Sequence, residues 1–317
     1  MIVALAGGVG GARLARGLID VLTRNELAIA VNTGDDFEHL GLHISPDLDT
    51  VMYTLAGIND PVQGWGIAGE TWNFMQALEQ VGGETWFRLG DRDLATHVER
   101  TLRLRANESL SAVTQHLCSR LGVQHRVMPM SDDSVRTILH TRTGPLAFQD
   151  YFVRNRAEPA VTHIEFAGAE YATMSPGLLD ALDDPALEAV IICPSNPYLS
   201  IAPILAVPQM RAALEQRRVP TIAVSPIVGG RALKGPAAKI MRELGYEPSA
   251  LTVAQFYRGL IDALVLDRSD QSLSRPIEEL GIRPVVTDTV MHDHRMQTCL
   301  ARSVIETARS LRARVKR

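Results

Sequence analysis

The sequence predicts an α/β protein built on a mostly parallel sheet, and three observations support that class. The apolar run Ile2–Ala6 leads into a glycine-rich turn and then into a helical pattern. A second run, Ala189–Cys193, is apolar throughout, as in strands buried on both faces of a parallel sheet. Several predicted strands end in Gly, Ser or Asn, which would meet at one sheet edge. We therefore expect a Rossmann-like three-layer α/β/α core.

Composition narrows the class of protein further. The chain has 317 residues, of which 46% are hydrophobic, and a formal net charge of −4, which gives no electrostatic reason to expect nucleic acid as a partner. No apolar run is long enough to span a membrane, and the N-terminus lacks a signal-peptide pattern. Three isolated cysteines indicate neither a disulfide framework nor a zinc site. We expect a soluble, cytoplasmic protein.

The glycine-rich turn after the first strand is a candidate phosphate-binding loop. Gly8, Gly10 and Gly11 allow close backbone approach and positive φ at a helix N-terminus, where free N–H groups attract anions. Arg13 stands where a dinucleotide-binding fingerprint has its third Gly or Ala, and Asn32 replaces the acidic residue that holds a ribose. The pattern thus disfavours a nicotinamide site. A tight turn with a purely structural role is the alternative.

Acidic residues gather after the predicted strand Leu27–Val31. Asp35, Asp36, Asp47 and Asp49 follow one another closely, and such carboxylates repel unless they share a cation. Mg²⁺ uses one or two carboxylates together with substrate phosphate oxygens. We expect a magnesium and phosphate site here, with Asp47 or Asp49 as the metal ligand. Alternatively, Asp35 and Asp36 cap a turn and Asp47 caps the helix starting near residue 48.

The middle of the chain, about 65–180, is predicted as an inserted, smaller α+β cap on a core formed by about 1–60 and 185–317. Trp65 lies between two glycines, which suits stacking on a flat ligand, although it also suits a surface loop. Arg88 and Arg92 could grip phosphate or a ring oxygen, or else form salt bridges that cap the next helix. His97 is expected to be a packing residue rather than a base.

Two later strand ends supply polar side chains. Ser195 and Asn196 follow the strand at 189–193, and Ser225 follows the strand at 221–224, so all three are candidates for holding a phosphate or the edge of a base. Their types equally suit local hydrogen bonds in proline-bracketed turns.

Several motifs together resemble the 2-phospho-L-lactate transferase family, known as CofD in archaea and FbiA in actinobacteria. Three of them are highly specific: Ser45–Thr50 (Ser-Pro-Asp-Leu-Asp-Thr), Leu89–Asp93 (Leu-Gly-Asp-Arg-Asp) and Pro194–Pro197 (Pro-Ser-Asn-Pro). Others are Gly7–Gly11, Asn32–Asp36, Met130–Asp133 and Val224–Ile227. The shared segments run nearly from end to end.

The resemblance implies a transfer reaction in coenzyme F-420 biosynthesis. The ribityl hydroxyl of the deazaflavin Fo (7,8-didemethyl-8-hydroxy-5-deazariboflavin) attacks a guanosine diphospho-linked three-carbon acid and displaces GMP with Mg²⁺ assisting. The transferred group is 2-phospholactate, phosphoenolpyruvate or 3-phosphoglycerate. Asp49 and Arg88 would contact the deazaflavin, although many relatives carry Lys in place of Arg88. Family members tend to be homodimers.

The residues fit this chemistry independently, because displacement at phosphorus needs positioning and charge neutralisation more than a covalent nucleophile. Asp47 or Asp49 would take the hydroxyl proton. We expect Asp49→Asn to abolish transfer with the fold intact. Two rivals remain: a nucleotide-sugar-binding regulatory protein of the same superfamily, and a nicotinamide oxidoreductase.

Overall fold

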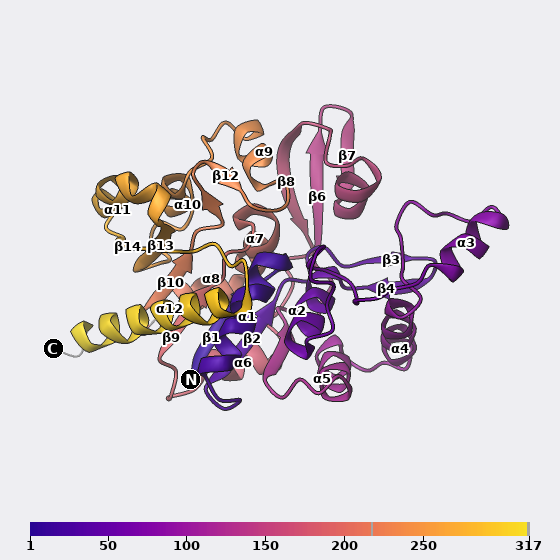
Figure 1. The fold of residues 1–317 in the computed structure, drawn as a ribbon, viewed down its shortest axis with the longest axis horizontal. Helices are drawn as coiled ribbons and strands as arrows, with labels where there is room; N and C mark the ends of the chain where they lie inside the picture. Colours follow the sequence, from indigo (N-terminus) through magenta and orange to yellow (C-terminus); the bar gives the residue numbers. More distant parts are fainter. Residues whose placement is uncertain (217, 316–317) are drawn as a thin grey trace.

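A seven-stranded sheet forms the centre of the molecule in a computed structural model that describes residues 1–216 and 218–315 (Figure 1). All neighbouring strands in it are parallel, and their order is β14-β13-β10-β9-β1-β2-β5. The strands are β1 (Ile2–Ala6), β2 (Leu27–Val31), β5 (Arg126–Pro129), β9 (Ala189–Ile192), β10 (Thr221–Val224), β13 (Ala263–Asp267) and β14 (Arg283–Thr287). The predicted α/β class with a parallel sheet is confirmed.

Both faces of the sheet are covered by helices, which explains why its central strands are apolar at every position. Along β1, Val3 and Leu5 point into one core, while Ile2, Ala4 and Ala6 point into the other. The second core is covered by α1 (Gly8–Val21), α2 (Pro46–Ala56), α5 (Leu110–Arg120) and α12 (His294–Val315). The first is covered by α6 (Pro176–Asp183), α7 (Ala202–Ala206), α8 (Pro208–Glu215), α9 (Ala237–Glu243), α10 (Ala250–Phe256) and α11 (Ser274–Glu279).

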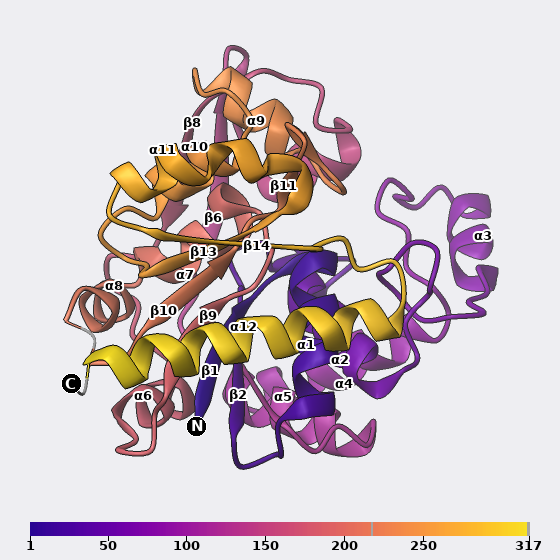
Figure 2. The same ribbon diagram turned by 60° about the vertical axis from the view of Figure 1, so that its left-hand side comes forward.

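The longest helix, α12, crosses the sheet beside α1 in both views (Figures 1 and 2). It runs from His294 to Val315 and contributes Leu300, Ala301 and Val304 to the second core. None of the helices among the described residues combines the length and apolarity that crossing a membrane requires.

The strand order places a switch point next to β1. The chain moves from β1 to β2 on one side and later returns to β9 on the other side of β1. The connections after β1 and β9 therefore diverge to opposite faces, and a crevice opens beyond the carboxyl ends of these two strands, where open α/β sheets bind ligands. The glycine-rich turn follows β1 and Pro194–Asn196 follows β9, so two of the predicted motifs meet at this crevice.

The middle of the chain is less separate from the core than the sequence predicts. Strand β5 lies within the stretch 65–180, yet it pairs with β2 and forms the edge of the main sheet. Its Val127 and Met128 are buried, and each enters a different core, so the apolar content of this strand belongs to the sheet. One strand of the expected cap, β5, and the helix α5 beside it therefore belong to the core.

Smaller units, from the middle segment and from other parts of the chain, surround the main sheet. An antiparallel sheet contains β6 (Arg136–Thr141), β7 (Gly144–Ala147) and β8 (Val161–Ala167). A hairpin, β3 (Phe37–His39) and β4 (Leu42–Ile44), extends toward α3 (Asn73–Gln80) and α4 (Asp93–Arg105) at the right of Figure 1. A second hairpin, β11 (Ile227–Val228) and β12 (Arg231–Ala232), follows β10. Short helical turns span Asp150–Arg154, Pro197–Ile201 and Arg268–Leu273.

Candidate active site

A cavity of about 700 Å³ lies beyond the carboxyl ends of β1, β9 and β10. We divide its lining into two parts. The glycine end consists of Gly7–Gly10, Asn32, Asp35, Asp47, Pro194–Asn196 and Ser225. The aromatic end consists of Asp49, Tyr53, Trp86, Phe87, Arg88, Asp93, His97, Phe148 and Phe152.

The glycine end is built from backbone in close contact. Helix α1 begins at Gly8, whose φ of +62° favours glycine. A Cβ at Gly10 would lie 2.2 Å from the carbonyl oxygen of Pro194, so no side chain fits there. The Gly8 N–H donates to Asp47 Oδ1 at 2.7 Å, and the Gly7 N–H donates to Ser195 Oγ at 3.0 Å. The glycines thus permit both the turn and the packing of α1 against the loop after β9.

Asp47 does not cap its own helix, contrary to the alternative weighed from the sequence. Helix α2 starts at Pro46, the first-turn position that proline favours, and Ser45 is the N-cap. Asp47 lies in the first turn and contacts the N-terminus of α1 instead. Asn32 joins it to Asp35, since the Asn32 amide nitrogen lies 2.9 Å from Asp47 Oδ2 and 3.2 Å from Asp35 Oδ1.

Asp35 and Asp47 form an oxygen-rich, buried pair. Burial raises the pKa of Asp47 to about 6, against the lowering effect of hydrogen bonds from Asn32 and Gly8. Burial, and then the neighbouring carboxylates of Asp47 and Asp36, raise the pKa of Asp35 well above its usual value. Two carboxylates held this close in a dry site favour either a proton or a cation between them.

Polar side chains after β9 and β10 are partly engaged with their own loops. Asn196 Oδ1 accepts hydrogen bonds from the N–H groups of Tyr198 and Leu199 and caps the turn Pro197–Ile201. Ser225 Oγ donates to the carbonyl of Ile227 at 2.9 Å. The local role considered from the sequence is therefore present at both positions, although both residues also line the cavity.

At the aromatic end, Asp49 is paired with a buried arginine of α4. Arg100 is 1% exposed, and its two terminal nitrogens contact the two carboxylate oxygens of Asp49, one of them at 3.1 Å. Burial alone would lower the pKa of Arg100, but the Asp49 carboxylate raises it above its ordinary value. Burial raises the pKa of Asp49 as well, while the charges of Arg100 and His97 oppose that rise. The paired contacts of Arg100 fix the orientation of the Asp49 carboxylate at the cavity wall.

Asp93 and His97 complete this cluster one turn apart on α4. The Tyr53 hydroxyl donates to Asp93 Oδ1 at 2.5 Å, and His97 Nε2 lies 3.4 Å from the same oxygen. His97 Nδ1 lies 3.7 Å from Asp49 Oδ2. Asp49, Asp93 and His97 have ligand atoms close enough for a metal ion. The Arg100 guanidinium already occupies Asp49, however, and a histidine ligand suits Mg²⁺ poorly.

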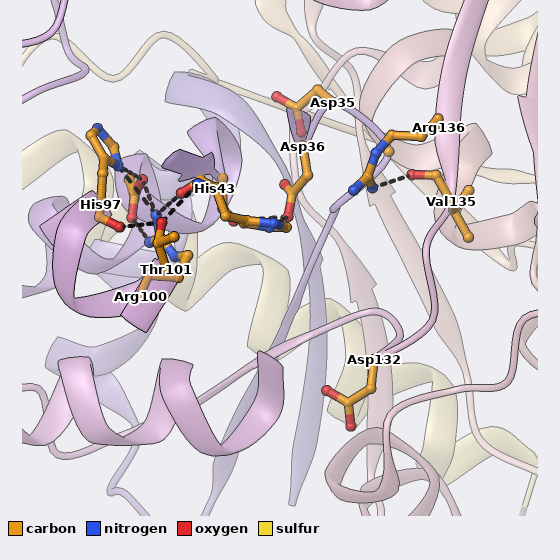
Figure 3. A network of polar contacts seen from close by, with 12 residues as sticks. Asp35, Asp36, His43, His97, Arg100, Thr101, Asp132, Val135 and Arg136 are labelled. Carbon is orange, nitrogen blue, oxygen red and sulfur yellow. Dashed lines mark hydrogen bonds and ion pairs between the residues drawn. The ribbon is translucent and has the colours of Figure 1, made fainter. Parts of the chain in front are cut away.

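The network extends from α4 to the acidic residues after β2 (Figure 3). Thr101 Oγ1 accepts the backbone N–H of His43 at 2.8 Å, and the His43 ring lies 3.1 Å from Asp36 Oδ2. Ser45 Oγ donates to the same Asp36 oxygen at 2.8 Å. Figure 3 shows His43 between the α4 side chains and Asp36, with Asp132 standing apart. Asp36 thus supports the hairpin β3–β4 and does not line the cavity.

Aromatic rings pack together at this end of the cavity. Phe37, His39, Trp86 and Phe87 pack with centroid distances between 4.8 and 6.2 Å. Phe148 and Phe152 are stacked at 5.6 Å. The Arg88 guanidinium lies 4.0 Å from the centre of the Trp72 ring. Several of these rings face the cavity beside buried carboxylates, an arrangement that suits a flat, polar ring system.

The family model described as 2-phospho-L-lactate transferase CofD matches residues 2–305. The chain is 42% identical to a phosphoenolpyruvate transferase of Streptomyces griseus over 98% of this chain and 99% of that one. It is 37% identical to a 2-phospho-L-lactate transferase of Methanosarcina mazei over 96% and 99% of the two chains. The chain belongs to the CofD family.

This membership confirms the resemblance predicted from the motifs and makes the protein a transferase of CofD type. A crystal structure of a UPF0052-family protein from Bacillus halodurans shares the fold, with a TM-score of 0.61 over 96% of this chain and 98% of that one. The sequence identity of that pair is 13%, so the likeness concerns the fold alone.

Most of the site residues predicted from the sequence meet in one cavity. Those that line it are Gly8, Gly10, Asn32, Asp47, Asp49, Trp65, Arg88, Ser195, Asn196 and Ser225. Two do not. Gly11 is packed beneath Ser195, whose Oγ would lie 2.6 Å from a Cβ at that position. Arg92 precedes α4 and turns away, and its guanidinium donates to the carbonyl of Ala68 at 3.0 Å.

Arg100, the most deeply buried charge of the site, is not among the candidate residues that the sequence indicates. His97, expected to be a packing residue, lies in the same charged cluster. A signal was present, since Asp93, His97 and Arg100 are spaced by four and then three residues and so share one face of a helix. Asp91, by contrast, only anchors the preceding loop, accepting hydrogen bonds from Thr71, Asn73 and Phe74.

Proposed function

We propose that this protein transfers a phospho-three-carbon-acid group from a guanosine diphospho-linked donor to the ribityl hydroxyl of Fo, releasing GMP, in coenzyme F-420 biosynthesis. End-to-end similarity to transferases of this family supports the reaction class. The observation that carries the assignment of substrates is the single cavity, in which the glycine end suits a diphosphate and the aromatic end suits a deazaflavin.

The donor would lie at the glycine end. The Val9 and Gly10 N–H groups precede the first intrahelical hydrogen bond of α1, so they are available to phosphate oxygens. Ser195 and Asn196 border the same space from the loop after β9. Such contacts hold the reacting phosphorus in line with its leaving group, which is the main requirement for phosphoryl-type displacement.

The acceptor hydroxyl would lie beside Asp49. The hydroxyl oxygen forms a bond to the phosphorus nearer the acid, the bond from that phosphorus to the guanylate oxygen breaks, and Asp49 takes the hydroxyl proton. Arg100 keeps the Asp49 carboxylate in one orientation through its paired contacts. Trp86, Phe87, Phe148 and Arg88 would contact the deazaflavin ring. Trp65, which is 48% exposed, would contact it from the rim.

Magnesium fits the glycine end better than the aromatic end. Asp35 and Asp47 offer carboxylate oxygens, which are the ligand type Mg²⁺ prefers, and the Asn32 amide nitrogen donates to both and holds them in place. We therefore propose Asp47 with Asp35 as the residues that would hold Mg²⁺, and Asp49 as the base. A bound Mg²⁺ would neutralise diphosphate charge during displacement. Removal of divalent ions with a chelator should stop transfer, and Mg²⁺ should restore it.

The decisive test is mass spectrometry of the product. Purified protein, Fo and Mg²⁺ are incubated separately with the guanosine diphospho-linked forms of lactate, enolpyruvate and glycerate. We expect one adduct of Fo to dominate, with release of an equal amount of GMP. The acids differ by one hydroxyl or one double bond, which a site recognises through side-chain placement. Tight binding of a UDP-sugar with no affinity for Fo would contradict the proposal.

We also propose that the protein acts as a cytoplasmic homodimer on small molecules, with no nucleic-acid or membrane partner. Size-exclusion chromatography with light scattering tests the dimer. A monomer at micromolar concentration would exclude it and would leave the transfer reaction unaffected as a proposal.

A further inference from the structure

Two cations on the rim of the cavity have no role in the site described so far. Arg13 is on α1, one turn beyond the glycine-rich turn, and Lys234 follows the hairpin β11–β12. Both line the cavity. Arg13 is the residue that departs from the dinucleotide fingerprint. The two side chains come from segments separated by most of the chain, so their approach is a product of the fold.

Neither cation is neutralised by a carboxylate at ion-pair distance among residues 1–216 and 218–315. The Arg13 guanidinium donates to the carbonyl of Met291 at 3.2 Å. The Lys234 ammonium donates to the carbonyls of Val62 at 3.2 Å and Gln63 at 2.6 Å. Burial, and then the positive charge of Arg13, lower the pKa of Lys234, while the charge of Asp60 opposes this effect. Two like charges beside one cavity favour an anion between them.

Lys234 also joins two loops across the cavity mouth. Its two carbonyl partners belong to the loop that carries Trp65, and this loop touches α1 as well. A Cβ on Gly64 would lie 2.6 Å from Val9 and 3.4 Å from the Lys234 ammonium nitrogen. An ammonium group has three donors, so with two engaged by Val62 and Gln63 one remains for a ligand.

We propose that Arg13 and Lys234 form a binding subsite for the diphosphate of the nucleotide donor, and that the bound diphosphate fixes the loop 60–66 over the cavity through Lys234. The subsite rests on the proposed function, because it requires a nucleoside diphosphate at the glycine end. Arginine supplies a planar fork of donors and lysine a compact charge, and both recognise phosphate. Since Val62 and Gln63 are held by the same ammonium, donor binding and loop position are linked.

The test measures GDP affinity by titration calorimetry in the presence of Mg²⁺ for Arg13→Gln and Lys234→Gln. Loss of one charge-assisted contact should weaken GDP binding about 10- to 100-fold. Guanosine, which lacks phosphate, should bind each variant as it binds the wild type. Lys234→Arg should recover part of the loss. Thermal unfolding checks that the variants remain folded.

Matched controls remove a positive charge nearby without touching the cavity. Arg16→Gln changes the next turn of α1, where Arg16 pairs with Asp20 at 2.8 Å, and Arg231→Gln changes the exposed first residue of β12, which does not line the cavity. Both should bind GDP as the wild type does. If they weaken binding as much as Lys234→Gln, the effect is one of overall charge and the subsite is refuted.

Hydrogen exchange provides a readout of the loop itself. GDP should slow amide exchange in 60–66 in the wild type but not in Lys234→Gln. Wild-type affinity for GDP in both Arg13→Gln and Lys234→Gln would overturn the subsite while leaving the transferase proposal standing. A wild-type protein that fails to bind GDP would instead overturn the proposed function, and the subsite with it.

Discussion

The two ends of the cavity are made in different ways. At the glycine end, the contacts come from backbone and short side chains fixed by the ends of parallel strands. The space between these backbones limits which residues fit there. At the aromatic end, the contacts come from long charged and aromatic side chains on α2, α4 and the loops between. The stability of that end depends on each buried charge having a partner of opposite sign. Variants at the first end should respond to volume, and variants at the second end to charge.

The largest effect is expected from Arg100→Met. The substitution leaves the buried Asp49 carboxylate without its partner, and breaking a buried pair in this way costs about 3–5 kcal/mol of the free energy of unfolding. Urea denaturation of the purified protein measures the change. The double variant Asp49→Asn with Arg100→Met removes both charges and should be more stable than Arg100→Met alone. If Arg100→Met is as stable as the wild type, Arg100 and Asp49 do not form a buried ion pair in solution.

Asp49→Asn should lower the rate of transfer to Fo by about 100- to 10,000-fold, because the base is lost. The structure alters the expectation that the fold would be untouched, since Arg100 then keeps a buried positive charge without the carboxylate that pairs with it. We expect lower stability together with unchanged GDP affinity. Single-turnover assays and GDP titration separate the two effects. Near-normal turnover would remove Asp49 from the mechanism.

Gly10→Ala tests the glycine end by volume alone. The added methyl would meet the Pro194 carbonyl oxygen at 2.2 Å, so α1 or the loop after β9 must shift. Overpacking of this kind costs about 1–3 kcal/mol of stability. GDP affinity should fall, while Fo affinity should change little. Gly177→Ala is the control, because its nearest neighbour is the flexible Met128 sulfur at 3.2 Å. Equal behaviour of the two variants would contradict the comparison.

Arg88→Gln should have the smallest effect. It removes a guanidinium that stacks on Trp72 and lines the aromatic end, a contact of about 0.5–1 kcal/mol at an exposed site. The KM for Fo should rise several-fold with little change in kcat. Arg92→Gln should leave both constants unchanged, because that side chain faces Ala68. The reverse result would restore Arg92 to the deazaflavin site.

Patterns within short stretches of the sequence predicted much of the fold correctly. All-apolar runs such as those at 2–6, 27–31 and 189–193 correctly predicted buried parallel strands. A strand that is covered on both faces has no side that meets water, so none of its positions favours a polar residue. The motifs after these strands also met as expected, since carboxyl ends of parallel strands share one edge. Strand β5 was misplaced in the cap because Arg126–Pro129 is short and its partner β2 is distant in sequence.

The sequence by itself determined the α/β class, the family and ten of the residues that line the cavity, because strand burial and short motifs are written in consecutive residues. Only the tertiary structure decided which charge each of them faces. Asp49 and Arg100 are 51 positions apart, and Arg13 and Lys234 are still more distant. Such pairs depend on how helices and loops pack on the sheet, and no local spacing encodes that packing.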